Sequence, residues 1–320
     1  MTEPNPPVVR NPEIMKLSLF AACLVACPAW IFAQAPVAGP GAKPITHKFL
    51  KSGCGSHGPA IVDVDGKILW QYAIEDETND AWALPGGSVI FAYHDGVREV
   101  AADAKTIVWE YKAAAGGEIH SCQPLPGELF LISEAHNQVG YLYEMDRKGV
   151  AHKTITIHGG GDAHANFRQV RKTAKGTYLV SFLYSTKTVV EYDADGKVVH
   201  DFKQGQYVGV RLPNGNTLLS CAEEHRVVEV DPADKVVWEV KENDLPGCKL
   251  AFVASVQRLP NGNTVIANWT GHGGGEVPQA VEVTPEKKIV WKVQDPRLGM
   301  ISNLQILDVP GDATKFTILR

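Results

Sequence analysis

Eleven histidines are the main supply of side chains in this 320-residue chain that can bind a metal or move a proton near neutral pH. His136, His225 and His272 each follow the corresponding residue of a recurring strand segment by seven residues. His120 and His164 lie in segments that join one copy of the repeat to the next. Neutral imidazoles are common ligands of zinc, copper and iron. The sequence therefore predicts a transition-metal site formed by His120, His136, His164, His225 and His272.

Carboxylates accompany these histidines, among them Glu118, Glu134 and Glu224. A metal-bound water as nucleophile, with a free histidine as acid or base, would make the protein a lyase or a hydrolase. The alternative is structural, because duplication of a repeat copies a turn histidine without giving it a function. No catalytic residue is assigned from the sequence.

The segments that must position the histidines are copies of one repeat. The phrase IVDVDGKILWQY at 61–72 returns in related form up to VEVTPEKKIVWKV at 281–293, at spacings of 38 to 53 residues. A second phrase, LPNGNTLLS at 212–220, stands between these copies. Asp-Gly-Lys and Pro-Asn-Gly-Asn favour tight turns between β-branched flanks, so each phrase predicts a β-hairpin. Two hairpins per period are typical of the four-stranded blades of a β-propeller.

Ring closure predicts the number of blades. Residues 36–70 and the 29 residues after Trp291 together exceed one repeat but fall short of two. We therefore expect an all-β propeller of six blades, with seven as the alternative, closed by pairing of the N- and C-terminal segments. In this architecture eight of the eleven histidines map to one face of the ring. Corresponding glutamines of the innermost strands are expected to line the central channel: Gln123, Gln169, Gln257 and Gln305.

The repeats resemble those of the pyrroloquinoline-quinone-like (PQQ-like) group of bacterial secreted propellers, which includes arylsulfotransferase-like propellers. The motifs that carry this resemblance are VDVDGKILWQY, ADAKTIVWEY and LPNGNTLLS…RVVEVDPADKVVWEV, and it covers residues 45–320. It implies the propeller architecture. The true quinoprotein dehydrogenases have eight blades and an adjacent pair of cysteines, which this chain lacks. PQQ is therefore not expected as a cofactor.

The N-terminus has the pattern of a processed leader. Residues 1–14 are polar and read as a mis-assigned upstream extension, and 15–35 have the basic, apolar and small-residue order of a signal peptide. A linker over 36–45 and a single propeller domain over 46–320 follow. Secretion, or release into the periplasm, is the favoured destination, without a membrane span. The alternative is a lipoprotein anchored through Cys27.

The charge balance of the sequence argues against one class of partner, nucleic acid. Lys and Arg number 31 against 36 Asp and Glu, so the chain has no basic surplus that would favour nucleic acid. A protein, a carbohydrate or a small molecule bound at the propeller face remains. The four cysteines after the leader can pair in three ways, and the sequence does not choose among them: Cys54, Cys122, Cys221 and Cys248. The first functional hypothesis is a ligand- or protein-binding module without PQQ, and the second is the metal-dependent lyase or hydrolase.

Overall fold

The computed structural model describes residues 46–320, apart from residues 55–57, 160 and 272–275. The predicted extension 1–14, signal peptide 15–35, linker 36–45 and lipid anchor at Cys27 lie outside the described residues. His57 and His272 lie outside them as well. Across the part that is described, no helix combines the length and the apolar composition needed to cross a bilayer.

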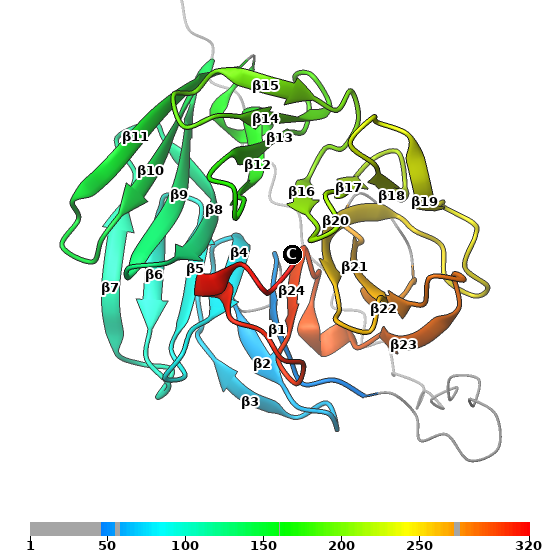
Figure 1. The fold of residues 1–320 in the computed structure, drawn as a ribbon. Helices are drawn as coiled ribbons and strands as arrows, with labels where there is room; N and C mark the ends of the chain where they lie inside the picture. The colour runs from blue at the N-terminus through cyan, green and yellow to red at the C-terminus, as the bar shows by residue number, and fades with distance from the viewer. Residues whose placement is uncertain (1–45, 55–57, 160, 272–275) are drawn as a thin grey trace, which may run out of the picture.

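Six four-stranded antiparallel sheets stand around a central axis, so the predicted all-β propeller is confirmed and its blade number is six (Figure 1). From the innermost strand outward, blade 1 has β24 (Asn303–Ile306), β1 (Phe49–Ser52), β2 (Ala60–Val62) and β3 (Ile68–Gln71). Blade 2 has β4 (Thr78–Ala83), β5 (Val89–Tyr93), β6 (Gly96–Val100) and β7 (Ile107–Lys112). Blade 3 has β8 (Glu118–Leu125), β9 (Leu129–His136), β10 (Val139–Met145) and β11 (Ala151–His158).

The second half of the ring follows the same order. Blade 4 has β12 (Phe167–Lys172), β13 (Tyr178–Phe182), β14 (Thr188–Tyr192) and β15 (Val198–Asp201). Blade 5 has β16 (Val208–Arg211), β17 (Thr217–Cys221), β18 (Arg226–Val230) and β19 (Val236–Val240). Blade 6 has β20 (Phe252–Arg258), β21 (Thr264–Trp269), β22 (Ala280–Val283) and β23 (Ile289–Val293). The described helices are short: α1 (Ala163–Asn166), η1 (Pro296–Leu298) and η2 (Ala313–Lys315).

Blade 1 closes the ring with strands from both ends of the sequence, as predicted. The antiparallel register pairs Leu50 of β1 with Gln305 of β24. Side chains reinforce this seam, because His47 Nε2 lies 2.8 Å from Glu282 Oε2 of blade 6 and His47 Nδ1 lies 3.0 Å from Asp308 Oδ1. The closing blade is thereby fixed to its neighbour as well as to itself.

Turn chemistry sets the hairpins. Asp146 Oδ1 accepts hydrogen bonds from the backbone N–H groups of Lys148 (2.8 Å) and Val150 (3.0 Å). Gly149 in this turn has φ 78°, a left-handed conformation that costs glycine little. Equivalent aspartates at positions 193 and 231 make the same pair of bonds. The recurrent Asp of the sequence thus fixes the turn between the third and fourth strands.

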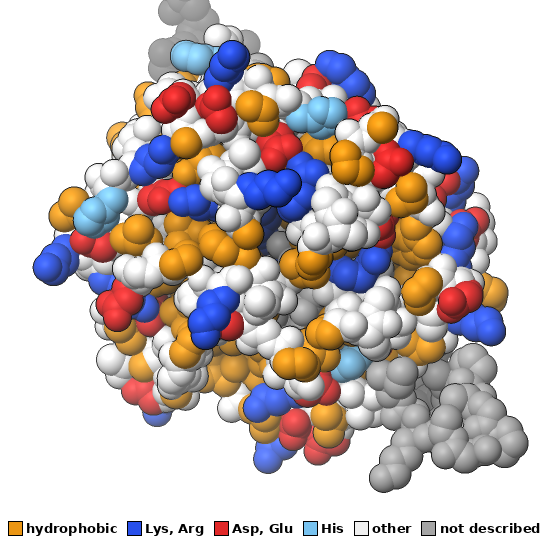
Figure 2. Space-filling model, viewed as in Figure 1, with side chains coloured by type: hydrophobic (Ala, Val, Ile, Leu, Met, Phe, Trp, Pro, Cys, Tyr) orange, Lys and Arg blue, Asp and Glu red, His pale blue; other side chains and the backbone are white. Residues whose placement is uncertain are grey.

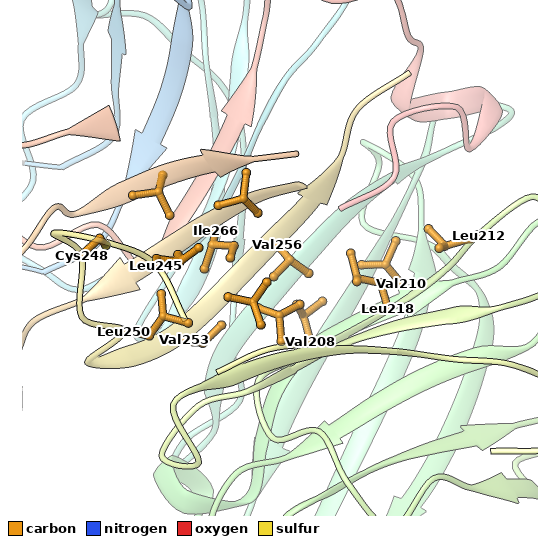
Figure 3. Packing of buried hydrophobic residues seen from close by; sticks show 14 residues of the cluster. Val208, Val210, Leu212, Leu218, Leu245, Cys248, Leu250, Val253, Val256 and Ile266 are labelled. Carbon is orange, nitrogen blue, oxygen red and sulfur yellow. The ribbon is translucent and has the colours of Figure 1, made fainter. Parts of the chain in front are cut away.

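Apolar layers between neighbouring blades form the core. Figure 3 shows one of them, in which Val208 and Leu218 of blade 5 pack with Val256 and Ile266 of blade 6. The repeat tryptophans extend these contacts outward, since Trp238 Nε1 donates to the backbone oxygen of Pro285 in the next blade at 2.8 Å. Three of the described cysteines are buried in the apolar core, namely Cys122, Cys221 and Cys248, and Cys54 is partly buried. These four form no disulfide with one another.

The final residues lie at one end of the central channel, at the middle of the ring in Figure 1. Arg320 is 2% exposed and donates through Nη1 to the backbone oxygen of Ala81 at 2.6 Å. Arg171 Nη1 donates to the buried Asp80 at 2.8 Å. Figure 2 shows Lys and Arg side chains gathered around the centre of this face. The innermost strands end here, so each of them begins at the opposite end of the channel.

Candidate functional site

The candidate site lies where innermost strands begin. Glu118 and His120 start β8 of blade 3. His164 lies on α1 in the connection between blades 3 and 4, and Arg168 lies at the start of β12, the innermost strand of blade 4. His120 has no partner in the β8–β9 register, since Ile119 pairs with Glu134 and the next pair starts at Ser121. A bulge of this kind re-aims side chains and is frequent beside active sites. At this bulge Glu118 and His120 of β8 both face His164 and Arg168.

Glu118 is the centre of the cluster, because three imidazoles point at its carboxylate. His120 Nε2 lies 3.0 Å and His164 Nδ1 3.2 Å from Oε2, while His94 Nε2 lies 2.6 Å from Oε1. The side chain of Glu118 is 11% exposed and that of His120 is 2% exposed, whereas those of His94 and His164 are half exposed. One largely buried carboxylate therefore orients a buried imidazole and two accessible ones.

Arg168 closes the cluster from the other side. Its Nη1 lies 3.2 Å from His120 Nδ1 and donates to the backbone oxygen of His164 at 2.8 Å. Its Nη2 lies 3.3 Å from His164 Nε2. Glu118 accepts from Nδ1–H of His164, which leaves Nε2 of that ring with a lone pair that faces Arg168 Nη2. Arg168 Nη1 also lies 3.1 Å from His120 Nε2, and since Nε2–H donates to Glu118, only Nδ1 of His120 can accept from the guanidinium.

The surroundings separate the basicities of the two imidazoles. Burial, aided by the charge of Arg168, lowers the pKa of His120 to about 3, so this ring stays neutral. The hydrogen bond to Glu118 raises the pKa of His164 above its ordinary value. Burial opposes ionisation of Glu118, but the hydrogen bonds from His120 and His164 outweigh it and hold the pKa of the carboxyl below its usual range. Divergent protonation within one cluster is the pattern of acid–base sites.

The predicted metal ligands are only partly brought together. His120 and His164 meet with Glu118, and one ligand atom from each lies within 4.8 Å of the others. His136 Nε2 instead lies 2.7 Å from Glu134 Oε1, and His225 Nδ1 contacts the backbone oxygen of Ala251. His272 lies outside the described residues. The Glu–His–His set has the chemistry of a zinc-type site, but the guanidinium of Arg168 lies against both imidazoles and opposes a second cation there.

A hollow of about 430 Å³, its open mouth included, adjoins the cluster. Its polar lining consists of Glu77, His164, Arg168 and Ser302. Its apolar lining is largely aromatic and consists of Leu183, Tyr184, Tyr207, Phe252 and Trp269. The aromatic rings brace one another, with centroids 5.9 Å apart for Tyr207 and Phe252 and 5.2 Å for Phe252 and Trp269. A small molecule seated here would contact His164 and Arg168 directly.

The predicted glutamines lie on innermost strands, and their amides link these strands to one another. Gln123 Oε1 accepts from Lys172 N at 2.7 Å, Gln257 Oε1 from Ile306 N at 2.8 Å and Gln305 Oε1 from Ala83 N at 3.0 Å. Gln169 Nε2 donates to the backbone oxygen of Asn79 at 3.1 Å. Their observed contacts hold the ring together rather than face the hollow.

Sequence reasoning missed two members of the cluster. The spacing of His94 differs from that of the other turn histidines, and Arg168 belongs to no repeated pattern. The available signal for Arg168 was its position four residues after His164, in the segment that opens β12.

The family model described as Mal s 1 allergenic protein-like matches residues 59–288. A solved protein of unknown function from Bacteroides caccae is 32% identical, with a TM-score of 0.74 over 81% of this chain and 98% of that chain. A streptogramin B lyase is 8% identical, with a TM-score of 0.53 over 78% of this chain and 84% of that one.

A further lyase structure has the same fold. It is a catalytically inactive histidine-to-alanine variant of virginiamycin B lyase from Staphylococcus aureus, solved with quinupristin, at 9% identity and a TM-score of 0.51 over 78% of this chain and 87% of that one. No curated protein sequence matches the chain. The resemblance to PQQ-like repeats is thus confirmed for the propeller architecture, while the family match is to the Mal s 1-like group.

Proposed function

We propose that this chain, which belongs to the Mal s 1 allergenic protein-like family, is an acid–base enzyme of the lyase type that acts on a small molecule in the hollow beside His164. One observation carries the proposal. His164 lines the hollow with a raised pKa on a largely buried glutamate, while its neighbour His120 is held neutral.

The residues divide the work as follows. Glu118 fixes the ring of His164 through Nδ1–H and leaves the lone pair on Nε2, so that Nε2 can take a proton from a substrate carbon. The electron pair of the broken C–H bond forms a double bond to the adjacent carbon, and the leaving group departs from that carbon with its own bonding pair. Arg168, 3.3 Å from Nε2, stabilises the negative charge that develops on a neighbouring carbonyl or carboxyl oxygen. The proton on His164 then passes to the leaving group.

The fold neighbours favour the lyase class within acid–base chemistry. Two of the similar folds are lyases, and one of them is inactive as a histidine-to-alanine variant. The first tests are therefore eliminations, and the next are hydrolyses.

The experiment is a panel of β-substituted carbonyl and carboxyl compounds, followed by NMR in D2O for alkene formation and for deuterium entering the substrate. His164→Gln should lower the rate by about 10²- to 10⁴-fold, the range for loss of a general base. His158→Gln is the matched control, because His158 is exposed at the same end of the ring and outside the cluster. Equal rates in His164→Gln and in the unchanged protein would refute the assignment, and turnover of no compound would favour the ligand-binding module.

The metal hypothesis has its own test. Elemental analysis of tag-free protein, together with thermal shifts on adding zinc, copper or iron, measures whether Glu118, His120 and His164 take an ion in place of the contact with Arg168. Less than about a tenth of an equivalent of bound metal per protein, with no thermal shift, would refute the metal hypothesis. Proton transfer would then depend on the side chains alone.

Export is part of the proposal. The signal peptide predicted over 15–35 supports export of the propeller from the cytoplasm, either released or anchored through Cys27. Fractionation of expressing cells, with Cys27→Ser as the comparison, distinguishes the released form from the anchored one.

A further inference from the structure

Arg168 differs from the other arginines that the structure describes. Eight of these nine side chains have a carboxylate oxygen within 4.0 Å: Arg98, Arg147, Arg171, Arg211, Arg226, Arg258, Arg297 and Arg320. Arg168 is 6% exposed and makes no such ion pair with a described residue. Its recorded hydrogen bonds go to imidazole nitrogens and to backbone oxygens, all of them uncharged acceptors when the rings are neutral.

A buried guanidinium without a counter-ion is costly, because loss of water is not repaid by a nearby negative charge. Arg168 is also part of the wall of the hollow, where a ligand can reach it. Guanidinium groups bind carboxylates through two parallel N–H···O bonds, which supply both charge and geometry. The missing counter-ion therefore corresponds to an anionic group of the ligand.

The rest of the hollow specifies the body of that ligand. Tyr207 and Phe252 are 4% and 5% exposed and form an edge-to-face pair, to which Trp269 adds a second. Flat apolar groups gain most from such walls, because they bury area and pack against ring edges. The hollow is small and open to solvent on one side, so it suits a small molecule.

We infer that the hollow binds a small carboxylate with an aromatic body, its carboxylate on Arg168 and its ring against Tyr207, Phe252 and Trp269. This inference rests on the proposed site and names its substrate class. A carboxylate oxygen on Arg168 Nη2 would lie beside His164 Nε2, which is 3.3 Å from that nitrogen. The carbon next to the carboxylate is thereby brought to the group that removes a proton.

Two carboxylates of the protein face this site and must be weighed. Glu118 is offset by N–H donors from His94, His120 and His164. Glu77 lines the hollow and makes no ion pair with a described residue, so it repels an anion. Glu77→Gln should therefore tighten binding of the carboxylate and leave binding of a neutral analogue unchanged.

The first experiment compares two ligands of nearly equal shape on the unchanged protein by isothermal titration calorimetry. These probes are 3-phenylpropionate and 3-phenylpropionamide. The carboxylate should bind at least about tenfold more tightly than the amide. Equal affinities, or no binding of either probe at millimolar concentration, would overturn the inference even if every variant failed to fold.

The second experiment assigns the preference to its residue. Arg168→Gln should remove the preference for the carboxylate, and Arg168→Lys should restore part of it. Arg226→Gln is the matched control, because Arg226 is paired with Glu224 and Glu239 away from the hollow. An unchanged preference in folded Arg168→Gln would overturn the inference.

Binding and catalysis fail separately. If the His164→Gln variant still prefers 3-phenylpropionate and the unchanged protein catalyses no elimination, the proposed function is refuted and the inference stands. If the protein catalyses an elimination that needs His164 but favours neutral substrates, the inference is refuted and the proposed function stands.

Discussion

Replacing His47 with Gln should loosen the seam that closes the propeller. His47 stands between Glu282 of blade 6, whose side chain is fully buried, and Asp308, whose side chain is 36% exposed. Without the imidazole, Glu282 keeps only uncharged side-chain donors, the amides of Asn263 at 2.6 Å and of Asn261. The carboxylate would then be buried with its charge uncompensated.

The magnitude follows from burial. Breaking one side of a buried pair costs about 3–5 kcal/mol, and the substituted amide can return part of one hydrogen bond. We expect a loss of about 3 kcal/mol in the free energy of unfolding, or roughly 6–12 °C in Tm at about 2–4 °C per kcal/mol. Asp308→Asn should cost below about 1 kcal/mol, because that carboxylate is open to solvent.

The loss should depend on pH. Burial lowers the pKa of His47, but the hydrogen bonds to Glu282 and Asp308 outweigh it, so the folded pKa lies above the ordinary value of 6.5. This stabilisation is fully present below pH 6.5 and is lost as the pH rises through the folded pKa. The pKa of Glu282 is lowered from 4.5, so its contribution is lost in acid. The difference between the two proteins should therefore be greatest between pH 4.5 and 6.5.

Urea unfolding at a series of pH values from about 5 to 8.5 measures this difference, with Asp308→Asn beside His47→Gln. A difference that stays constant across the series, or grows toward pH 8.5, would refute the reasoning about the seam.

Three further perturbations test other parts of the structure. Removal of residues 311–320 should lower the free energy of unfolding by roughly 5 kcal/mol, because apolar side chains of this segment pack on three core clusters; an unchanged melting temperature would contradict this. Asp80→Asn should cost about 3–5 kcal/mol, since two buried guanidinium groups lose their shared carboxylate, and a loss below 1 kcal/mol by urea unfolding would argue against that role. Glu118→Gln should lower the pKa of His164 in an NMR titration, and an unmoved pKa would show that the carboxylate does not set it.

The architecture could be predicted because it depends on residues close together in the sequence. Turn residues such as Asp146 and the alternation of the repeat specify hairpins without reference to the rest of the chain. The six-blade count and the pairing of β1 with β24 followed from repeat length and ring closure.

The site could be predicted only in part, because it depends on contacts between blades. His120 and His164 were expected on one face, and they meet there, but the position of Arg168 against both rings depends on the bulge at His120 and on α1. His136 was expected to join them, yet Glu134 in its own strand lies 2.7 Å away and holds it. The sequence repeats show which positions of the blades are equivalent. The site, however, is formed by residues that differ from one blade to the next, such as Arg168.

The most direct test of the account is the protonation of the two imidazoles on Glu118, measured by NMR of ¹⁵N-labelled histidine over a pH titration. We predict that His164 titrates above 6.5 and that His120 remains neutral through the range in which the protein stays folded. Adding 3-phenylpropionate should perturb the His164 signal and leave that of the control residue His158 in place. Titration of both rings near 6.5, with no response to the carboxylate, would contradict the acid–base site.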